Sequence, residues 1–228
     1  MPLYLYRIAG MDTLQIGIVM IVTGASQFLS APIAGFMNSK GMDYRKMLFI
    51  GMFGFALGCY TNSFLTPDWG FWEFFLSQFL RGGSLMFCFI PINEIVFNDM
   101  PKSEIQNASG IYNLMRNLGG AIGLAVINTT LINNTKKYSG YLAENMPVTD
   151  AMIYSYTGYI SDMFSARVPD ADGFSLALVN SMLQRDGNIL AINNIFVTIS
   201  FMFLAMILLL PLVAKRTPFD KDSGGAAH

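Results

Sequence analysis

Long apolar stretches alternate with short polar breaks along most of the chain. A helix that crosses the hydrocarbon core of a bilayer needs about 20 mostly apolar residues. Five stretches meet this requirement: residues 15–37, 47–65, 74–97, 109–132 and 193–213. Lipid offers no hydrogen bonds to an unpaired backbone, so such stretches span membranes as helices. The pattern predicts an all-α membrane protein with five transmembrane helices.

The composition supports this fold class and excludes several functions. The chain has 228 residues, of which 53% are hydrophobic and 13% charged, against about 25% charged in soluble domains. A formal net charge of −1 argues against binding to nucleic acid. Cys59 and Cys88 lie inside apolar runs, and His228 is the single histidine, so we expect no metal, no cofactor and no enzyme activity. No GxxxxGK[ST] phosphate loop is present, which argues against ATP-driven transport.

Basic residues gather in alternate short loops, which predicts the orientation. Lys40, Arg45 and Lys46 follow the first span, and Lys102 follows the third. The loop after the second span holds no Lys or Arg. The positive-inside rule therefore places the N-terminus outside and residues 215–228 in the cytoplasm as a tail.

The segment of residues 133–192 is the most polar part of the chain and falls outside in this topology. Its pattern favours one or two amphipathic helices at the outer surface, the second leading into the final span. Two interpretations stay open for this outer loop: a structural lid and a surface that docks a partner.

Ionisable and amide side chains inside the spans are the candidate functional residues. Charges at membrane depth are costly and seldom face lipid. Arg81 and Glu94 interrupt the third span and Arg116 the fourth. Helical spacing puts Asn113, Arg116, Asn117, Gly120 and Asn128 on one face. These residues serve either as a polar clamp between helices, with Glu94 and Arg116 as a pair, or as a solvated pathway for a substrate.

Small residues repeat at spacings that suit close helix packing. Gly54 and Gly58 form a GxxxG pattern in the second span, and Gly119 and Gly123 form another in the fourth. Such faces let helix backbones approach in lipid. The pattern fits simple helix association as well as the rocking faces of a transporter.

Three runs of residues carry a resemblance to a known family. Residues 15–35, the run Phe89–Asn93 and the block Ser-Gly-Ile-Tyr-Asn-Leu-Met-Arg-Asn-Leu-Gly-Gly at residues 109–120 resemble the C-terminal part of fourteen-helix drug:proton antiporters. These antiporters are the EmrB/QacA type of the major facilitator superfamily. The resemblance implies that residues 1–214 form part of a C-terminal bundle, equivalent to helices ten to fourteen.

The resemblance also assigns roles to individual positions. Gly35, Lys40 and Arg45 resemble a cytoplasmic latch motif, but Asn38 and Ser39 stand where an acid is usual. The run of residues 78–83, which contains Arg81, resembles a motif linked to proton coupling. The Gly119, Gly120 and Gly123 group resembles a glycine-rich bending motif without its proline.

By resemblance, the function is proton-coupled efflux of amphipathic small molecules from a multi-pass protein of the bacterial inner membrane. The energy source would be the proton gradient, and the partners would be lipid, a separately encoded N-terminal half and a periplasmic adaptor protein. Alternating access needs two bundles, so five helices are expected to be a fragment that is inactive alone. The alternatives are a truncated membrane protein that only binds partners, and a major facilitator transporter of a defined metabolite.

Overall fold

The computed structural model describes residues 2–8, 10–66, 69–97, 100–101, 103–145, 158–159, 161 and 171–212. Within these ranges the regular structure is helical. The main helices are α1 (Pro2–Arg7), α2 (Thr13–Ser39), α3 (Tyr44–Thr61), α4 (Phe71–Phe97), α5 (Ile105–Asn145) and α7 (Ala171–Ile207), with short 3-10 turns at Asn62–Phe64 and Leu210–Leu212. The predicted all-α membrane class is confirmed.

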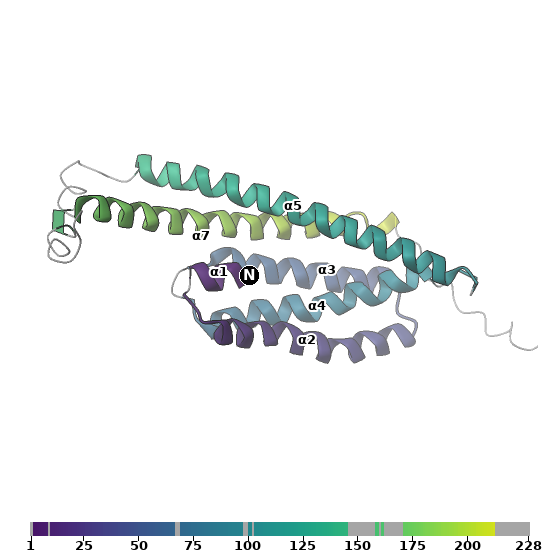
Figure 1. The fold of residues 1–228 in the computed structure, drawn as a ribbon. Coiled ribbons are helices and arrows are strands. Elements are labelled where there is room, and N and C mark those ends of the chain that lie inside the picture. Colours follow the sequence, from purple (N-terminus) through teal and green to yellow (C-terminus); the bar gives the residue numbers. More distant parts are fainter. Residues whose placement is uncertain are drawn as a thin grey trace, which may run out of the picture.

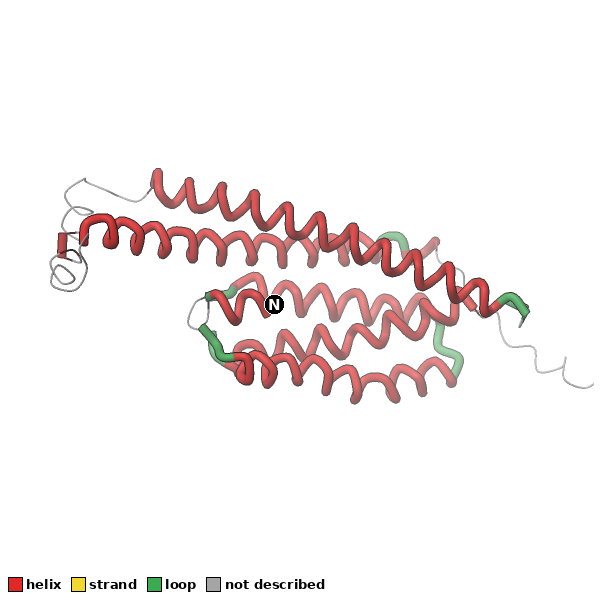
Figure 2. Tube along the Cα trace, in the orientation of Figure 1, coloured by secondary structure: helices red, strands yellow, loops and turns green. Residues whose placement is uncertain are grey.

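Each long helix runs opposite in direction to the one before it in the chain, so the packed neighbours α2 and α4 run parallel (Figures 1 and 2). Packing follows the order α2, α4, α3, α7 and α5, with α3 in the centre between α4 and α7. One end of this bundle carries α1 and the start of α2, and the other carries the turn between α2 and α3. We call them the outer and inner ends after the predicted orientation. The α5 and α7 pair projects beyond the other helices at the outer end (Figure 1).

Local sequence signals explain where α2 begins and ends. The Asp12 side chain accepts a hydrogen bond from the Thr13 amide at 2.8 Å, and the Gln15 side chain accepts one from the Asp12 amide at 3.1 Å. This reciprocal pair satisfies amide groups that a helix start leaves unpaired. At the inner end Gly41 has a φ of 82°, which glycine adopts without steric cost and which allows a tight turn into α3.

Four of the described helices are long and apolar enough to cross a membrane: Thr13–Ser39, Tyr44–Phe64, Phe71–Phe97 and Gly173–Leu212. They match four of the five predicted spans to within one residue at the ends of 47–65 and 193–213. The fifth, residues 109–132, lies within α5, whose 41 residues do not reach the same hydropathy. Asparagines and Arg116 lower its apolar content, so α5 is the least suited of the long helices to face lipid on all sides.

The structure extends the last two helices beyond their predicted boundaries. Much of the predicted outer loop, residues 133–192, is a continuation of α5 to Asn145 and of α7 back to Ala171. Close contact explains this: a Cβ added to Gly187 would lie 3.0 Å from the Ser139 amide, and the Thr135 hydroxyl donates to Asn188 Oδ1 at 2.9 Å. Residues 146–157, 160 and 162–170 of the predicted loop lie outside the described part.

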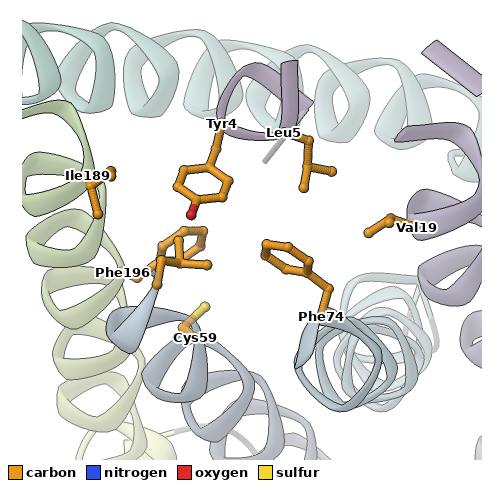
Figure 3. Close-up of a cluster of buried hydrophobic side chains, with 8 residues drawn as sticks. Tyr4, Leu5, Val19, Cys59, Phe74, Ile189 and Phe196 are labelled. Atoms are coloured by element: carbon orange, nitrogen blue, oxygen red, sulfur yellow. The ribbon is translucent and has the colours of Figure 1, made fainter. Parts of the chain in front are cut away.

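An apolar cluster fills the outer end of the bundle. Tyr4 and Leu5 of α1 point into the space between α2, α3, α4 and α7 (Figure 3). They meet Val19, Cys59, Leu65, Phe74, Ile189 and Phe196. The Tyr4 ring packs edge-on to Phe74 at 6.0 Å, and its hydroxyl donates to the Thr66 carbonyl at 2.7 Å. Helix α1 therefore closes the bundle just outside the level of Arg81.

Candidate functional site

The guanidinium of Arg81 lies inside the bundle, between α3 and α7. Its central carbon is 5.7 Å from the Phe55 ring centre and 5.6 Å from that of Phe196. The backbone of α3 comes close because position 58 is glycine: a Cβ there would lie 2.7 Å from Arg81 Cγ. The charge is thus held against aromatic faces, an interaction worth about 0.5–2 kcal/mol depending on desolvation.

A group of buried polar side chains surrounds this arginine without full hydrogen bonding. Among the residues that the structure describes, buried side-chain nitrogen and oxygen atoms without a partner belong to Asn62, Gln78, Arg81 and Asn193. We call these four residues the buried polar layer. Asn62 is 0% exposed and Gln78 is 1% exposed. Each unpaired buried group costs about 1–3 kcal/mol, so packing alone does not account for this layer.

The four residues come from three helices at one level. Gln78 and Arg81 are one turn apart on α4, and Asn193 is one turn before Phe196, whose ring faces Arg81. Asn62 lies one turn beyond Gly58, and its 3-10 turn packs against α7. Two bonds tie the layer to its surroundings: the Thr23 hydroxyl donates to Gln78 Oε1 at 2.8 Å, and Asn193 Nδ2 donates to the Leu65 carbonyl at 3.0 Å.

Small residues on α3 allow the close packing that buries the layer. Gly51, Gly54 and Gly58 face Cys88, Ser84 and Arg81 of α4 in antiparallel register. On the other side of α4, Gly82 lies against Thr23 and Ser26 of α2. This places the predicted Gly54 and Gly58 pattern at a real helix contact and adds Gly51 to it.

Helix α5 carries a second polar region, which this chain leaves uncovered. Asn113, Asn117, Gly120 and Asn128 are exposed and lie on one side of the helix between positions 113 and 128, together with the exposed Leu124. We call them the polar flank of α5. Ile111, Met115, Leu118, Ile122 and Val126 are exposed on the opposite side, the apolar flank. Two ring contacts join α5 to α4 between these flanks: Arg116 lies 4.5 Å from the Phe89 ring centre, and Tyr112 packs edge-on to Phe97.

Comparison with known proteins places the chain in a family. The sequence profile of the Major Facilitator Superfamily matches residues 1–126. The chain belongs to the major facilitator superfamily. The colistin resistance protein EmrB of Acinetobacter baumannii is 41% identical over 130 residues, which are 57% of this chain and 25% of that protein.

Two further relatives align with almost the whole chain. The fatty acid resistance protein FarB of Neisseria gonorrhoeae is 24% identical over 99% of this chain and 43% of its own length. The multidrug export protein EmrB of Escherichia coli K12 is 23% identical over 100% of this chain and 43% of its own length. The aligned parts make up 25% to 43% of the length of these relatives, so this chain spans less than half of each. The resemblance to an EmrB-type major facilitator protein is confirmed.

Membership of the major facilitator superfamily points to transport, and the apolar helices make the chain a multi-pass membrane protein in contact with lipid. The predicted roles of individual residues stay predictions. The structure brings Arg81 into a buried cluster but leaves Asn113, Asn117 and Asn128 exposed. Among the described side chains Arg116 faces Phe89 and forms no ion pair with the half-buried Glu94.

The glycines and basic residues of the motif-like runs lie in open surroundings. A Cβ at Gly35, Gly119, Gly120 or Gly123 would meet nothing within 4 Å, so no contact of this chain requires a glycine there. At the inner end Arg45 donates to the Pro211 carbonyl at 2.8 Å, and Lys40 lies 4.4 Å from the Phe36 ring centre. Arg45 therefore joins the start of α3 to the end of α7.

Sequence reasoning missed three members of the buried polar layer. Gln78 stands in the arginine-containing run, but a single amide gives no signal that distinguishes it from a surface residue. Asn62 and Asn193 stand at the ends of apolar stretches, where polar residues are expected to meet water. Their shared level with Arg81 depends on how α3, α4 and α7 pack, which helical spacing within one span does not reveal.

Proposed function

We propose that this chain supplies part of the C-terminal bundle of a proton-coupled exporter of amphipathic compounds in the bacterial inner membrane. The observation that carries the proposal is the divided surface of α5. Between positions 111 and 128 it shows three asparagines and a glycine, with Leu124 among them, on one flank and only large apolar side chains on the other.

The two flanks suit two different environments. At 3.6 residues per turn, Met115 and Asn117 point about 160° apart around the helix. The apolar flank suits lipid. The polar flank is costly in lipid, so it requires cover from protein or a water-filled path. We infer that this flank lines the substrate path between this chain and the remaining part of the transporter.

The names of the relatives support the choice of substrates. These relatives are named for resistance to colistin, for resistance to fatty acids and for multidrug export. Colistin and fatty acids are amphipathic, and a path lined by the asparagines of the polar flank offers partners for the polar part of such molecules. In this proposal the asparagines of the polar flank bind polar groups of the substrate, and Arg81 belongs to the machinery that couples export to protons.

A chimera tests the proposal. This chain replaces the aligned part of the E. coli multidrug export protein in a strain without its own exporters, and accumulation of a fluorescent amphipathic dye is measured. We expect export that stops when the proton gradient is dissipated, and no export from this chain alone. Asn117→Leu should raise dye accumulation towards that of cells without the chimera, whereas Asn180→Leu, at an exposed position of α7, should not.

Two outcomes would contradict the proposal. Export that persists without a proton gradient would exclude proton coupling. Full export by the Asn117→Leu chimera at normal abundance would exclude the polar flank from the path. A chimera that is abundant and folded but exports nothing would favour a membrane protein that only binds partners.

A further inference from the structure

A seam between α3 and α7 runs from a basic groove at the inner end towards the middle of the bundle. The groove has a volume of about 550 Å³ and is lined by Arg45 and Lys46 together with Phe49, Ile207 and Leu210. No acidic side chain lines it among the described residues. The apolar part continues outward as a second hollow of about 260 Å³ along Phe53, Leu57, Phe201 and Leu204.

The seam has a basic inner end, and its remaining wall along α3 is apolar. Lys46, Phe49, Phe53 and Leu57 recur at helical spacing on one face of α3. The Phe49 and Phe53 rings stack with centres 5.9 Å apart and planes 5° apart, which makes one wall of the seam. Both rings are 48% exposed, so the wall is open to an occupant from outside the chain.

The contact between the helices fixes this shape. The Ser200 hydroxyl donates to the Ala56 carbonyl at 2.9 Å, which holds α7 against α3 at the bottom of the second hollow. At the inner end the bond from Arg45 to Pro211 holds the last turn against the start of α3. These two hydrogen bonds therefore fix the positions of α3 and of the chain end that form the walls of the seam.

We propose that this seam binds an anionic phospholipid, with the headgroup phosphate at Arg45 and Lys46 and one acyl chain along α3 and α7. From Lys46 to Leu57 the helix rises about 16 Å at 1.5 Å per residue. That length matches about half of a 30 Å hydrocarbon core, which is the depth of one leaflet. Basic pockets between transmembrane helices on the cytoplasmic side recognise anionic headgroups, and the inner end is the predicted cytoplasmic end.

The net charge of the headgroup distinguishes the lipids that could bind in the seam. A zwitterionic headgroup brings its own cation to the basic groove, whereas phosphatidylglycerol brings a net negative charge. A basic residue near the headgroups contributes roughly 1 kcal/mol, which is about fivefold in affinity. The proposal concerns lipid contact and does not depend on the export function proposed above.

The purified chain in detergent, titrated with dioleoyl-phosphatidylglycerol or dioleoyl-phosphatidylcholine and analysed by native mass spectrometry, tests the proposal. The two lipids share acyl chains, so their difference reports the headgroup. We expect phosphatidylglycerol to bind at least fivefold more tightly. Lys46→Gln should lower this preference by about fivefold. Lys136→Gln, at an exposed position near the outer end, should leave the preference unchanged. Arg45 is unsuited to this test because it also holds the end of α7.

Two further arms separate the headgroup from the acyl chain. Leu57→Ser should weaken binding of both lipids while keeping their ratio. Glycerol phosphate, which has the headgroup chemistry without acyl chains, should not displace bound lipid at equal concentration.

Several results would overturn the proposal. Equal affinity for the two lipids would do so, as would an equal loss of preference in the Lys46 and Lys136 variants. Displacement of lipid by glycerol phosphate would reduce the site to a phosphate site. Efficient cross-linking of two lipid-free copies through Phe53→Cys would assign the seam to a contact between protein chains.

Discussion

Replacing Gln78 with leucine should stabilise the bundle. The Gln78 Oε1 atom accepts one hydrogen bond, from Thr23 at 2.8 Å, while its Nε2 donors have no partner within the chain. The side chain is 1% exposed, so helices that pack onto the outside of this bundle do not reach it. Leucine is one atom shorter but of comparable volume, and it removes both the satisfied and the unsatisfied atoms.

The expected change in the free energy of unfolding combines the loss of the Thr23 hydrogen bond with the removal of the unpaired Nε2 donors. A side-chain hydrogen bond between transmembrane helices contributes about 0.6 kcal/mol on average and up to about 1.7 kcal/mol. Leaving a buried amide donor unpaired costs about 1–3 kcal/mol. The Thr23 hydroxyl that loses its acceptor is able to donate to a carbonyl of its own helix. We therefore expect Gln78→Leu to raise the free energy of unfolding by about 0.5–2 kcal/mol.

The assay is reversible unfolding of the purified protein in mixed micelles, with Thr23→Val and the double variant completing a mutant cycle. The coupling energy between the two positions should be about 0.5–1.5 kcal/mol, because they share one bond. Gln106→Leu, at an exposed position of α5, should change stability by less than about 0.5 kcal/mol. A decrease of more than about 1 kcal/mol in the free energy of unfolding of Gln78→Leu would refute this prediction, because it would mean that the Gln78 amide is fully paired.

Two further substitutions test the packing around the layer. Gly82→Val should lower the fraction of folded, monodisperse protein on gel filtration, because the valine side chain would collide with Ser26 and the Thr23 backbone. Gly83→Ala should leave that fraction unchanged, because an added Cβ there would meet nothing within 4 Å. Tyr4→Phe should lower the free energy of unfolding by about 0.5–1.5 kcal/mol, because the hydrogen bond to the Thr66 carbonyl is lost. Tyr6→Phe, at a 66% exposed position, should lower it by less than about 0.5 kcal/mol. An equal effect of both substitutions would contradict a closing role for α1.

The membrane helices were predictable because hydrocarbon thickness dictates their length. Apolar runs located α2, α3, α4 and the end of α7. The extensions of α5 and α7 were not predictable in the same way. The predicted amphipathic helix that leads into the final span corresponds to the start of α7. Its contact with the extension of α5 was not predicted, because the residues that hold the pair together, such as Gly187 and Ser139, are small or polar.

The cost of a charge in lipid predicted that Arg81 points inward, but it did not predict the neighbours of the guanidinium. Those neighbours, Phe55 and Phe196, are far away in the sequence and apolar, as are most residues around them. The same limit applies to Arg116, for which a pair with Glu94 was one of two interpretations and which lies over Phe89. Spacing within one helix identifies a face, while the partner of that face depends on the crossing of two helices.

Water access to the two flanks of α5 is the most direct test of the central claim, that the polar flank lines a substrate path. The chimera with the E. coli relative is made with Cys59→Ala and Cys88→Ala, and a single cysteine is introduced as Asn117→Cys or Met115→Cys. The rate of labelling by a hydrophilic thiol reagent is then measured in membranes. The account predicts that Asn117→Cys reacts at least about tenfold faster and is protected by substrate, because the two side chains point about 160° apart. Equal rates, or faster labelling of Met115→Cys, would contradict it.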